Sequence, residues 1–287
     1  MKSNICVFIG SGDLAVRSAS LLGDLGLSLY GVCRNPDALP SLFKGIEADY
    51  TQLGALNFLE LLAPNFLIVT FKPLKPDLSG YKQGFVNAAQ NLIDGLGKHI
   101  PNLVIFVSST RIFAENDGRW VNELSPRTKT DPLGKTIVQA EELLRGAGLP
   151  LVSLYCSGLY GFPTDYLVKR LKEGMFSSKL EKSFTNRVHR QDVAGVFAWL
   201  IGSKLNQERL QNAYIVSDSY PASRMEIELW LSGKLGLCQG DRKKVDALSS
   251  TRGGNKRCDN GLLLTSGYKL LYPDFRSGYG SILESLD

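Results

Sequence analysis

A short apolar run that ends in two spaced glycines is the feature that most restricts how this chain can fold. Residues 5–15 read ICVFIGSGDLA, in which the apolar run leads into Gly10, Gly12 and the start of a helical pattern. This spacing matches the G-x-G-x-x-G/A pattern. Gly10 permits a tight turn, Gly12 lets the backbone approach a phosphate, and Ala15 is small enough for close packing of helix on strand. These residues therefore predict a strand–turn–helix unit of an α/β fold.

The same loop predicts a site for a dinucleotide. The first amides of a helix have no partners within the helix, and the helix dipole places partial positive charge beside them. A pyrophosphate binds well at such a position. The alternative is a plain structural turn, because glycines after strands are common. The residues expected to bind the dinucleotide in this loop are Gly10, Ser11, Gly12, Asp13, Leu14 and Ala15.

Short apolar runs alternate with helical patterns over the first 160 residues. The expected strands are 5–10, 27–33, 66–71, 103–109 and 151–158, and the expected helices are 14–26, 77–99 and 135–148. The strand candidates are continuously apolar and rich in β-branched residues, as strands covered on both faces are. The alternation predicts an α/β fold with a Rossmann-type, doubly wound parallel sheet.

The pattern loosens after residue 160. Helices are expected near 164–173, 190–203 and 223–235, and a strand is expected at 213–218. We see no linker and no internal repeat between the two parts of the chain. We therefore expect a dinucleotide-binding domain at 1–160 and a smaller C-terminal α/β substrate lobe at 161–287 that is integrated with it.

Composition and charge argue against several classes of function. Hydrophobic residues make up 44% of the chain and charged residues 21%, which is ordinary for a soluble globular protein. No apolar run approaches the roughly 18–20 residues of a membrane helix, and the first run is too short for a signal peptide. The net charge of +5 suits an anionic ligand. The charges are scattered, and the densest cluster, at 240–246, includes two acids, so we expect neither nucleic acid nor membrane as a partner.

The cysteines and histidines give little material for a disulfide framework or a metal site. The five cysteines are Cys6, Cys33, Cys156, Cys238 and Cys258, and no two form a C-x-x-C pair. The two histidines, His99 and His189, are far apart in sequence. We expect reduced, mostly buried thiols in a cytoplasmic protein and no bound metal.

The residues after the second expected strand bear on the choice of nucleotide. An NAD-selective site places an acid there for the ribose 2′-hydroxyl. This sequence has Arg34 at that place and no acid before Asp37. Arg34 can pair with a 2′-phosphate through charge-assisted hydrogen bonds, which favours NADP over NAD. The alternative is that Arg34 is a surface arginine that only stacks on adenine.

Motifs spread over nearly the whole chain resemble the extended short-chain dehydrogenase/reductases, in the NAD-dependent epimerase/dehydratase group. The matching stretches are GSGDLA at 10–15, ADY at 48–50, TFKP at 70–73, VSSTRIF at 107–113, SGLYG at 157–161, NRVHRQDV at 186–193, NKR at 255–257 and YPDFR at 272–276. The last two stretches resemble an atypical subgroup of bacterial nucleoside-diphosphate-sugar-epimerase-like proteins. The resemblance implies a Rossmann-type fold and a small-molecule substrate such as a sugar nucleotide. The resemblance does not decide the oligomeric state, so we expect either a monomer or a homodimer.

The resemblance also implies further residues around the cofactor and the substrate. Those expected beside the cofactor are Arg34, Asp49, Tyr50, Thr70, Phe71, Lys72, Ser108 and Ser157. Those expected beside the substrate are Thr110, Arg111, Arg187 and His189. Arg111 can hold a phosphate or a carboxylate. The alternative for His189 is a purely structural role.

The expected catalytic residues depart from the family pattern. A Ser or Thr at the end of the strand works in this family with a Tyr-x-x-x-Lys pair on the next helix, and Ser109 keeps the first position. Aligned through Gly134 and Glu141, the tyrosine falls on Leu133 and the lysine on Ile137. Lys135 lies about 200° around the helix from Ile137 and is interpreted as a surface charge.

Tyr160, at the end of the strand at 151–158, is the best remaining candidate for the missing acid. Its alternative is an aromatic residue that packs the loop. Two functions follow. One is an NAD(P)-binding epimerase/dehydratase-like enzyme that acts on a sugar nucleotide, or a related hydroxyl or carbonyl substrate, with Ser109 and Tyr160 in place of the usual set. The other is an NADP(H)-binding regulatory or redox-sensing protein without dehydrogenase chemistry.

Overall fold

A computed structural model of the chain describes residues 3–163, 166–177, 183–237, 243–245 and 254–285. Cys238 and most of the charged cluster at 240–246 lie outside these residues. Of the other four cysteines, Cys6, Cys156 and Cys258 are buried and Cys33 is partly buried. Within the described parts, no helix is long and apolar enough to cross a membrane.

A seven-stranded sheet forms the centre of the fold, in the strand order β12-β7-β5-β4-β1-β2-β3. Its strands are β1 (Ile5–Ile9), β2 (Ser28–Cys33), β3 (Phe43–Glu47), β4 (Phe66–Val69), β5 (Leu103–Ser109), β7 (Leu151–Cys156) and β12 (Ala213–Val216). β1 pairs in parallel with β2 and β4, and the parallel pairing continues outward to β3 and β5. The chain crosses over between β3 and β4, so the Rossmann-type doubly wound sheet is confirmed.

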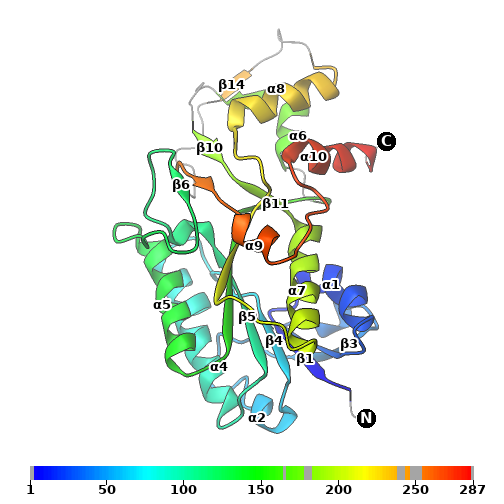
Figure 1. Ribbon diagram of the computed structural model, residues 1–287, viewed down its shortest axis with the longest axis vertical. Helices are drawn as coiled ribbons and strands as arrows, with labels where there is room; N and C mark the ends of the chain where they lie inside the picture. The colour runs from blue at the N-terminus through cyan, green and yellow to red at the C-terminus, as the bar shows by residue number, and fades with distance from the viewer. Residues whose placement is uncertain (1–2, 164–165, 178–182, 238–242, 246–253, 286–287) are drawn as a thin grey trace. The chain divides into compact units, whose positions relative to one another are not determined.

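Helices cover both faces of this sheet (Figure 1). α1 (Asp13–Gly23) and α7 (Arg190–Leu205) lie on one face, and α4 (Ala88–Leu96) and α5 (Pro132–Gly146) lie side by side on the other. The short helix α2 (Phe58–Leu62) precedes β4. α2 is not among the elements expected from the sequence, and β3 is not among the strands expected from apolar runs. β3 is an edge strand with exposed positions, so it lacks the continuous apolar run that marks its neighbours.

The helix expected over 77–99 is divided into three parts. It consists of α3 (Leu78–Tyr81), a π-helical turn η2 (Lys82–Asn87) and α4. The backbone of the preceding loop passes very close to this segment. A Cβ added at Gly80 would lie 2.3 Å from the backbone nitrogen of Lys75, and one added at Gly84 would lie 2.1 Å from the carbonyl oxygen of Lys72. Only glycine fits at these two positions, and this close approach accompanies the change of helical type.

The chain divides into two compact units. Unit 1 contains Met1–Ile112, Arg127–Tyr155 and Val193–Tyr214, and unit 2 contains Phe113–Pro126, Cys156–Asp192 and Ile215–Asp287. In unit 1, Phe8 of the central strand is fully buried and meets Phe43 and Phe197 edge-on at ring-centroid distances of 5.7 and 6.2 Å. These contacts join β1 to an edge strand and to α7.

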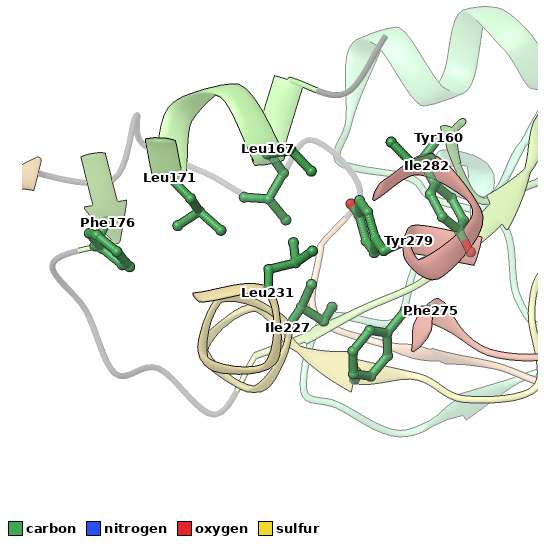
Figure 2. Packing of buried hydrophobic residues seen from close by; sticks show 11 residues of the cluster. Tyr160, Leu167, Leu171, Phe176, Ile227, Leu231, Phe275, Tyr279 and Ile282 are labelled. Atoms are coloured by element: carbon green, nitrogen blue, oxygen red, sulfur yellow. The ribbon is translucent and has the colours of Figure 1, made fainter. Parts of the chain in front are cut away.

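The described residues of unit 2 form short paired strands and four α-helices. The strand pairs are β8 (Gly158–Tyr160) with β11 (Arg187–His189), β6 (Trp120–Val121) with β15 (Arg257–Cys258), β10 (Phe184–Thr185) with β13 (Ala222–Ser223) and β9 (Met175–Ser177) with β14 (Lys243–Val245). The helices are α6 (Tyr166–Lys172), α8 (Arg224–Lys234), α9 (Gly261–Thr265) and α10 (Phe275–Glu284). Side chains of α6, α8 and α10 form an apolar core that includes Leu171, Leu231, Phe275 and Tyr279 (Figure 2).

Candidate functional site

The loop between β1 and α1 has the backbone geometry that its glycines predict. Gly10 lies in the left-handed region at φ +93°. The amides of Gly10 and Ser11 both donate to the Val32 carbonyl of β2, at 3.1 and 3.0 Å. A Cβ added at Gly10 would lie 2.9 Å from both the carbonyl and the hydroxyl oxygen of Thr70, whose hydroxyl donates to the Gly10 carbonyl. Glycine is therefore required here by conformation and by space.

Gly12 is a glycine for a different reason. Its backbone is extended, at φ −117°, and a Cβ added there would have no atom within 4 Å. No side chain caps the N-terminus of α1, and the Asp13 carboxylate is held by Arg17 at 3.0 Å. Ala15, one turn further, is fully buried. The loop thus offers uncapped helix amides beside open space, which fits the pyrophosphate of a dinucleotide.

Two aromatic residues that follow β3 and β4 form a pair in unit 1. Tyr50 packs against Phe71 with ring centroids 5.1 Å apart, and its hydroxyl accepts from the Lys72 amide at 3.3 Å. Burial raises the pKa of Tyr50, and the charge of exposed Arg34 acts in the opposite direction. Asp49 accepts from the amide and the hydroxyl of the residue two positions later, at 3.0 and 2.7 Å.

Ser108 and Ser109, which were predicted to contact the cofactor and to act in catalysis, lie at the end of β5. The Ser108 hydroxyl oxygen is buried and has no hydrogen-bond partner among the described residues. The Ser109 hydroxyl accepts from the Arg111 amide at 3.2 Å, and Thr110 between them is buried. A buried hydroxyl without a partner is costly, so Ser108 is suited to receive a hydrogen bond from a ligand or to give one.

The Arg111 guanidinium is paired inside unit 1. Its Nη2 donates to Asp131 Oδ1 at 3.0 Å, and its Nε donates to the other carboxylate oxygen. Asp131 is the N-cap of α5 and accepts from the Leu133 amide at 3.2 Å. Burial opposes ionisation of Asp131, but Arg111 outweighs it, so the pKa of this carboxyl is lowered. From the sequence, Arg111 was expected to bind a phosphate or carboxylate of the substrate. Asp131 was not predicted as its partner, and its position before Pro132 is the feature that could have marked it as a helix N-cap.

The face of α5 that would bear a tyrosine and a lysine is apolar. Ile137 is buried and Leu133 is half-buried, whereas Lys135 is exposed. The interpretation of Lys135 as a surface charge is confirmed. Unit 1 therefore presents Ser109 without the usual acid/base partners on the following helix.

Tyr160 lies within the apolar core of unit 2 (Figure 2). Its ring contacts His189 and Tyr279 at centroid distances of 5.3 and 4.8 Å, and its hydroxyl donates to the Asp274 carbonyl at 3.5 Å. A Cβ added at Gly278 would lie 1.9 Å from that hydroxyl oxygen. Burial raises the pKa of Tyr160 well above its usual range. The catalytic role of Tyr160 stays a prediction, and its surroundings are those of a core residue.

The other candidates of unit 2 also have partners within that unit. His189 accepts from the Gln191 amide through Nδ1 at 3.2 Å, and its ring lies 4.0 Å from that of Tyr272. Arg187 donates to the Thr185 hydroxyl at 2.8 Å. Ser157 is buried, and its hydroxyl donates to the Val216 carbonyl at 3.4 Å.

Unit 2 holds two buried carboxyls, Asp192 and Asp218, to which the sequence assigned no role of their own. Asp192 accepts from the Leu271 and Tyr272 amides at 2.7 and 3.1 Å. Asp218 is 2% exposed, and burial raises its pKa to about 7. Asp218 is the last residue of the strand expected at 213–218, and this position gave no sign that its carboxyl is buried. No group of three or more metal-ligating side chains occurs among the described residues.

Solved structures resemble this chain along nearly its whole length. A Methylobacillus flagellatus protein, provisionally described as an NAD-dependent epimerase/dehydratase, is 29% identical, with a TM-score of 0.81 and coverage of 99% of this chain and 98% of that chain. The chain has the fold of the extended short-chain dehydrogenase/reductases of the epimerase/dehydratase group. MoeE5, solved with UDP-glucuronic acid and NAD, is 18% identical, with a TM-score of 0.77 and 97% of each chain covered.

WbmG from Bordetella bronchiseptica, solved with NAD and UDP, also shares the epimerase/dehydratase fold. It is 16% identical, with a TM-score of 0.77, and the match covers 98% of this chain and 92% of that chain. No protein-family model and no curated protein matches the sequence. The resemblance inferred from the motifs is therefore confirmed by structure.

Proposed function

We propose that the chain binds a nicotinamide dinucleotide in unit 1 and acts on a sugar nucleotide, or on a related hydroxyl or carbonyl substrate, without a Tyr-x-x-x-Lys pair. The observation that carries this proposal is the open space at Gly12 beside the uncapped N-terminus of α1. No structural need for glycine exists at this position. Close approach of a ligand phosphate to the backbone supplies a reason for it.

The residues around this loop have the chemistry that a dinucleotide needs. Ser108 supplies a buried hydroxyl at the end of β5, and Tyr50 and Phe71 form an aromatic wall after β3 and β4. Arg34 is exposed and is the proposed partner of a 2′-phosphate, which makes NADP the favoured cofactor. A bound nicotinamide would supply the hydride chemistry, which no side chain provides.

Fold similarity to proteins solved with UDP or UDP-glucuronic acid supports a sugar nucleotide as the substrate class. In this proposal residues 1–160 hold the cofactor, and residues 161–287 form the smaller substrate lobe. Thr110, Arg187 and His189 remain the proposed substrate contacts, and the protein acts in the cytoplasm as a monomer or a homodimer.

The apolar face of α5 favours a second candidate, an NADP(H)-binding regulatory or redox-sensing protein. Leu133 and Ile137 stand where the acid and its partner lysine are expected, and Ile137 is 3% exposed. A protein that senses the dinucleotide needs the cofactor loop and does not need this pair.

Matched glycine substitutions test the cofactor site. Gly12→Ala adds a methyl group in open space, so the free energy of unfolding should change by less than about 1 kcal/mol. Its affinity for NADH and NADPH, measured by fluorescence titration, should fall at least about tenfold because the methyl group blocks the phosphate. Gly23→Ala in α1 also meets nothing within 4 Å and serves as the control.

Absence of binding by the unaltered protein up to about millimolar dinucleotide, a free energy near −4 kcal/mol, would refute the proposal. If Gly12→Ala and Gly23→Ala bind the dinucleotide with equal affinity, the phosphate does not bind against the loop at Gly12. Tight NADPH binding without hydride transfer across a panel of sugar nucleotides would favour the regulatory candidate.

A further inference from the structure

A tyrosine and an arginine from other elements meet next to α5. Tyr81, the last residue of α3, is half-buried, and the guanidinium carbon of Arg111 lies 5.8 Å from the centre of its ring. The hydrogen bond that Arg111 donates to Asp131 is the main reason why the pKa of Arg111 is raised, and the nearby Tyr81 adds to it. A phenol and a permanent cation thus lie together in unit 1, where α3 and η2 pack against α5.

Arg111 is fixed in place from two sides. Asp131 holds its guanidinium with two hydrogen bonds, one of them at 3.0 Å, and also caps α5. The Arg111 backbone amide donates to the Ser109 hydroxyl at 3.2 Å. One residue therefore connects the end of β5, the N-terminus of α5 and the ring of Tyr81. Gly134 of α5 packs on this arrangement, since a Cβ there would lie 3.0 Å from the Arg111 carbonyl.

Tyr81 is also held by its own segment. Asp77 caps α3 by accepting from the Gly80 amide at 2.7 Å, and its carbonyl accepts from the Tyr81 amide at 3.0 Å. The Tyr81 ring stacks on Phe85 with centroids 5.6 Å apart. The π-helical turn begins directly after Tyr81, and such turns occur frequently at functional sites.

We infer that Tyr81 and Arg111 carry out the proton transfer for which the epimerase/dehydratase fold normally uses the tyrosine and lysine of the helix after β5. This inference rests on the proposed function. The two residues bring the same two chemical groups, a phenol and a cation, to the same end of α5 from different positions in the sequence. Ser109 then remains the hydroxyl that orients the reacting oxygen.

The reductive step balances with these groups. A bound reduced dinucleotide would supply the hydride that forms a carbon–hydrogen bond at the carbonyl carbon of the substrate, and it would itself be oxidised. The carbonyl oxygen receives the phenolic proton of Tyr81, so that the substrate leaves as an alcohol. The guanidinium of Arg111 stabilises the phenolate that remains, and oxidation of an alcohol follows the same path in reverse.

If Tyr81 and Arg111 only stabilise the fold, a different result is expected. Tyr81→Phe keeps the ring, its stacking on Phe85 and its contact with the Arg111 cation, and removes only the hydroxyl. A structural pair would tolerate this change. The matched control is Tyr30→Phe, because Tyr30 lies beside a cation as well, with Lys44 Nζ 5.2 Å from its ring centre and 3.5 Å from its hydroxyl.

The test uses the full chain with NADP(H) and NAD(H), and with UDP-glucose and UDP-glucuronic acid as probes. Three quantities are measured: affinity for the reduced dinucleotide, affinity of the loaded protein for each probe by calorimetry, and the rate of dinucleotide reduction by the probes. Tyr81→Phe should lower the rate by about 100-fold or more. It should also weaken binding of the probe by roughly fivefold, because one hydrogen bond is lost. The affinity for the dinucleotide should not change.

Arg111→Gln should lower the rate as Tyr81→Phe does, and Arg111→Lys should restore part of it because the positive charge is kept. Tyr30→Phe should match the unaltered protein in all three measurements. If Tyr81→Phe also matches the unaltered protein while that protein reacts, the inference is wrong and the proposed function stands. If the unaltered protein binds the dinucleotide but neither binds nor oxidises a probe, the proposed sugar-nucleotide substrate and this inference fail together.

Discussion

The Tyr155 hydroxyl donates a 2.9 Å hydrogen bond to the Glu141 carboxylate and so ties α5 to β7 inside unit 1. The same oxygen of Glu141 accepts from Arg145 at 3.0 Å, and Arg145 in turn donates to Ser153 at 3.0 Å. Arg127 donates to the Tyr155 hydroxyl at 2.6 Å. Burial, followed by the charge of Glu141, raises the pKa of Tyr155 to about 12. Glu141 is therefore a buried anion whose partners fix the helix that follows Ser109.

Removal of the Glu141 charge should destabilise unit 1. Glu141→Leu leaves the buried Tyr155 hydroxyl without its acceptor and removes the ion pair of Arg145, so the free energy of unfolding in urea should fall by about 3 kcal/mol. Glu142→Leu is the control, because this neighbour is exposed and its loss should cost less than about 0.5 kcal/mol. Equal effects in the two variants would contradict a structural role for the Glu141 network.

Asp218 should make stability depend on pH. Its carboxyl is faced by Arg187 of β11, by Tyr160 of β8, and by the acids Asp192 and Asp274, and burial raises its pKa from 3.8 to about 7. The unfolded chain therefore loses the proton at lower pH than the folded chain. Relative to acid conditions, folding is progressively disfavoured from about pH 4 to about pH 7 and is constant above that.

Asp218→Asn removes this dependence. The variant should equal the unaltered protein near pH 4 and exceed it by up to about 4 kcal/mol at pH 7 and above, in thermal or urea unfolding. Asp117→Asn, at an exposed position of the same unit, should show no such trend. A constant difference between Asp218→Asn and the unaltered protein across this pH range would show that Asp218 is ionised throughout.

Arg34 should decide between the two nicotinamide dinucleotides. Arg34→Ala removes the proposed partner of the 2′-phosphate, so NADPH affinity should fall by about tenfold or more while NADH affinity changes little. Lys98→Ala, an exposed cation elsewhere in unit 1, controls for net charge. Fluorescence titration gives both affinities, and equal losses for NADPH and NADH would refute the 2′-phosphate role.

Gly10 should be required for folding, in contrast to Gly12. Gly10→Ala forces a side chain into a φ of +93° and places its methyl group 2.9 Å from the Thr70 carbonyl oxygen. The combined strain should cost about 2 kcal/mol or more in urea unfolding. Gly148→Ala has a similar φ of +76° but meets nothing within 4 Å, so it separates the conformational cost from the steric one.

The sequence alone determined the parts of this protein whose signals are local. Continuous apolar runs predicted β1, β4, β5 and β7, because strands buried on both faces need apolar residues throughout. The loop from Gly10 to Ala15 was predictable because the turn, the phosphate contact and the helix start involve consecutive residues. The apolar face at Leu133 and Ile137 was visible from helical spacing alone.

Only the tertiary structure decided which groups meet. Arg111 lies beside Tyr81 and Asp131, which are 30 positions before it and 20 after it, and no local pattern records such a meeting. Tyr160 follows a strand, as ligand-binding residues do, yet the fold places it in the core of unit 2. Burial also set the pKa of Asp218, because desolvation depends on every element that packs around the carboxyl. Local sequence specifies backbone shape, whereas the environment of a side chain is produced by distant segments that pack around it.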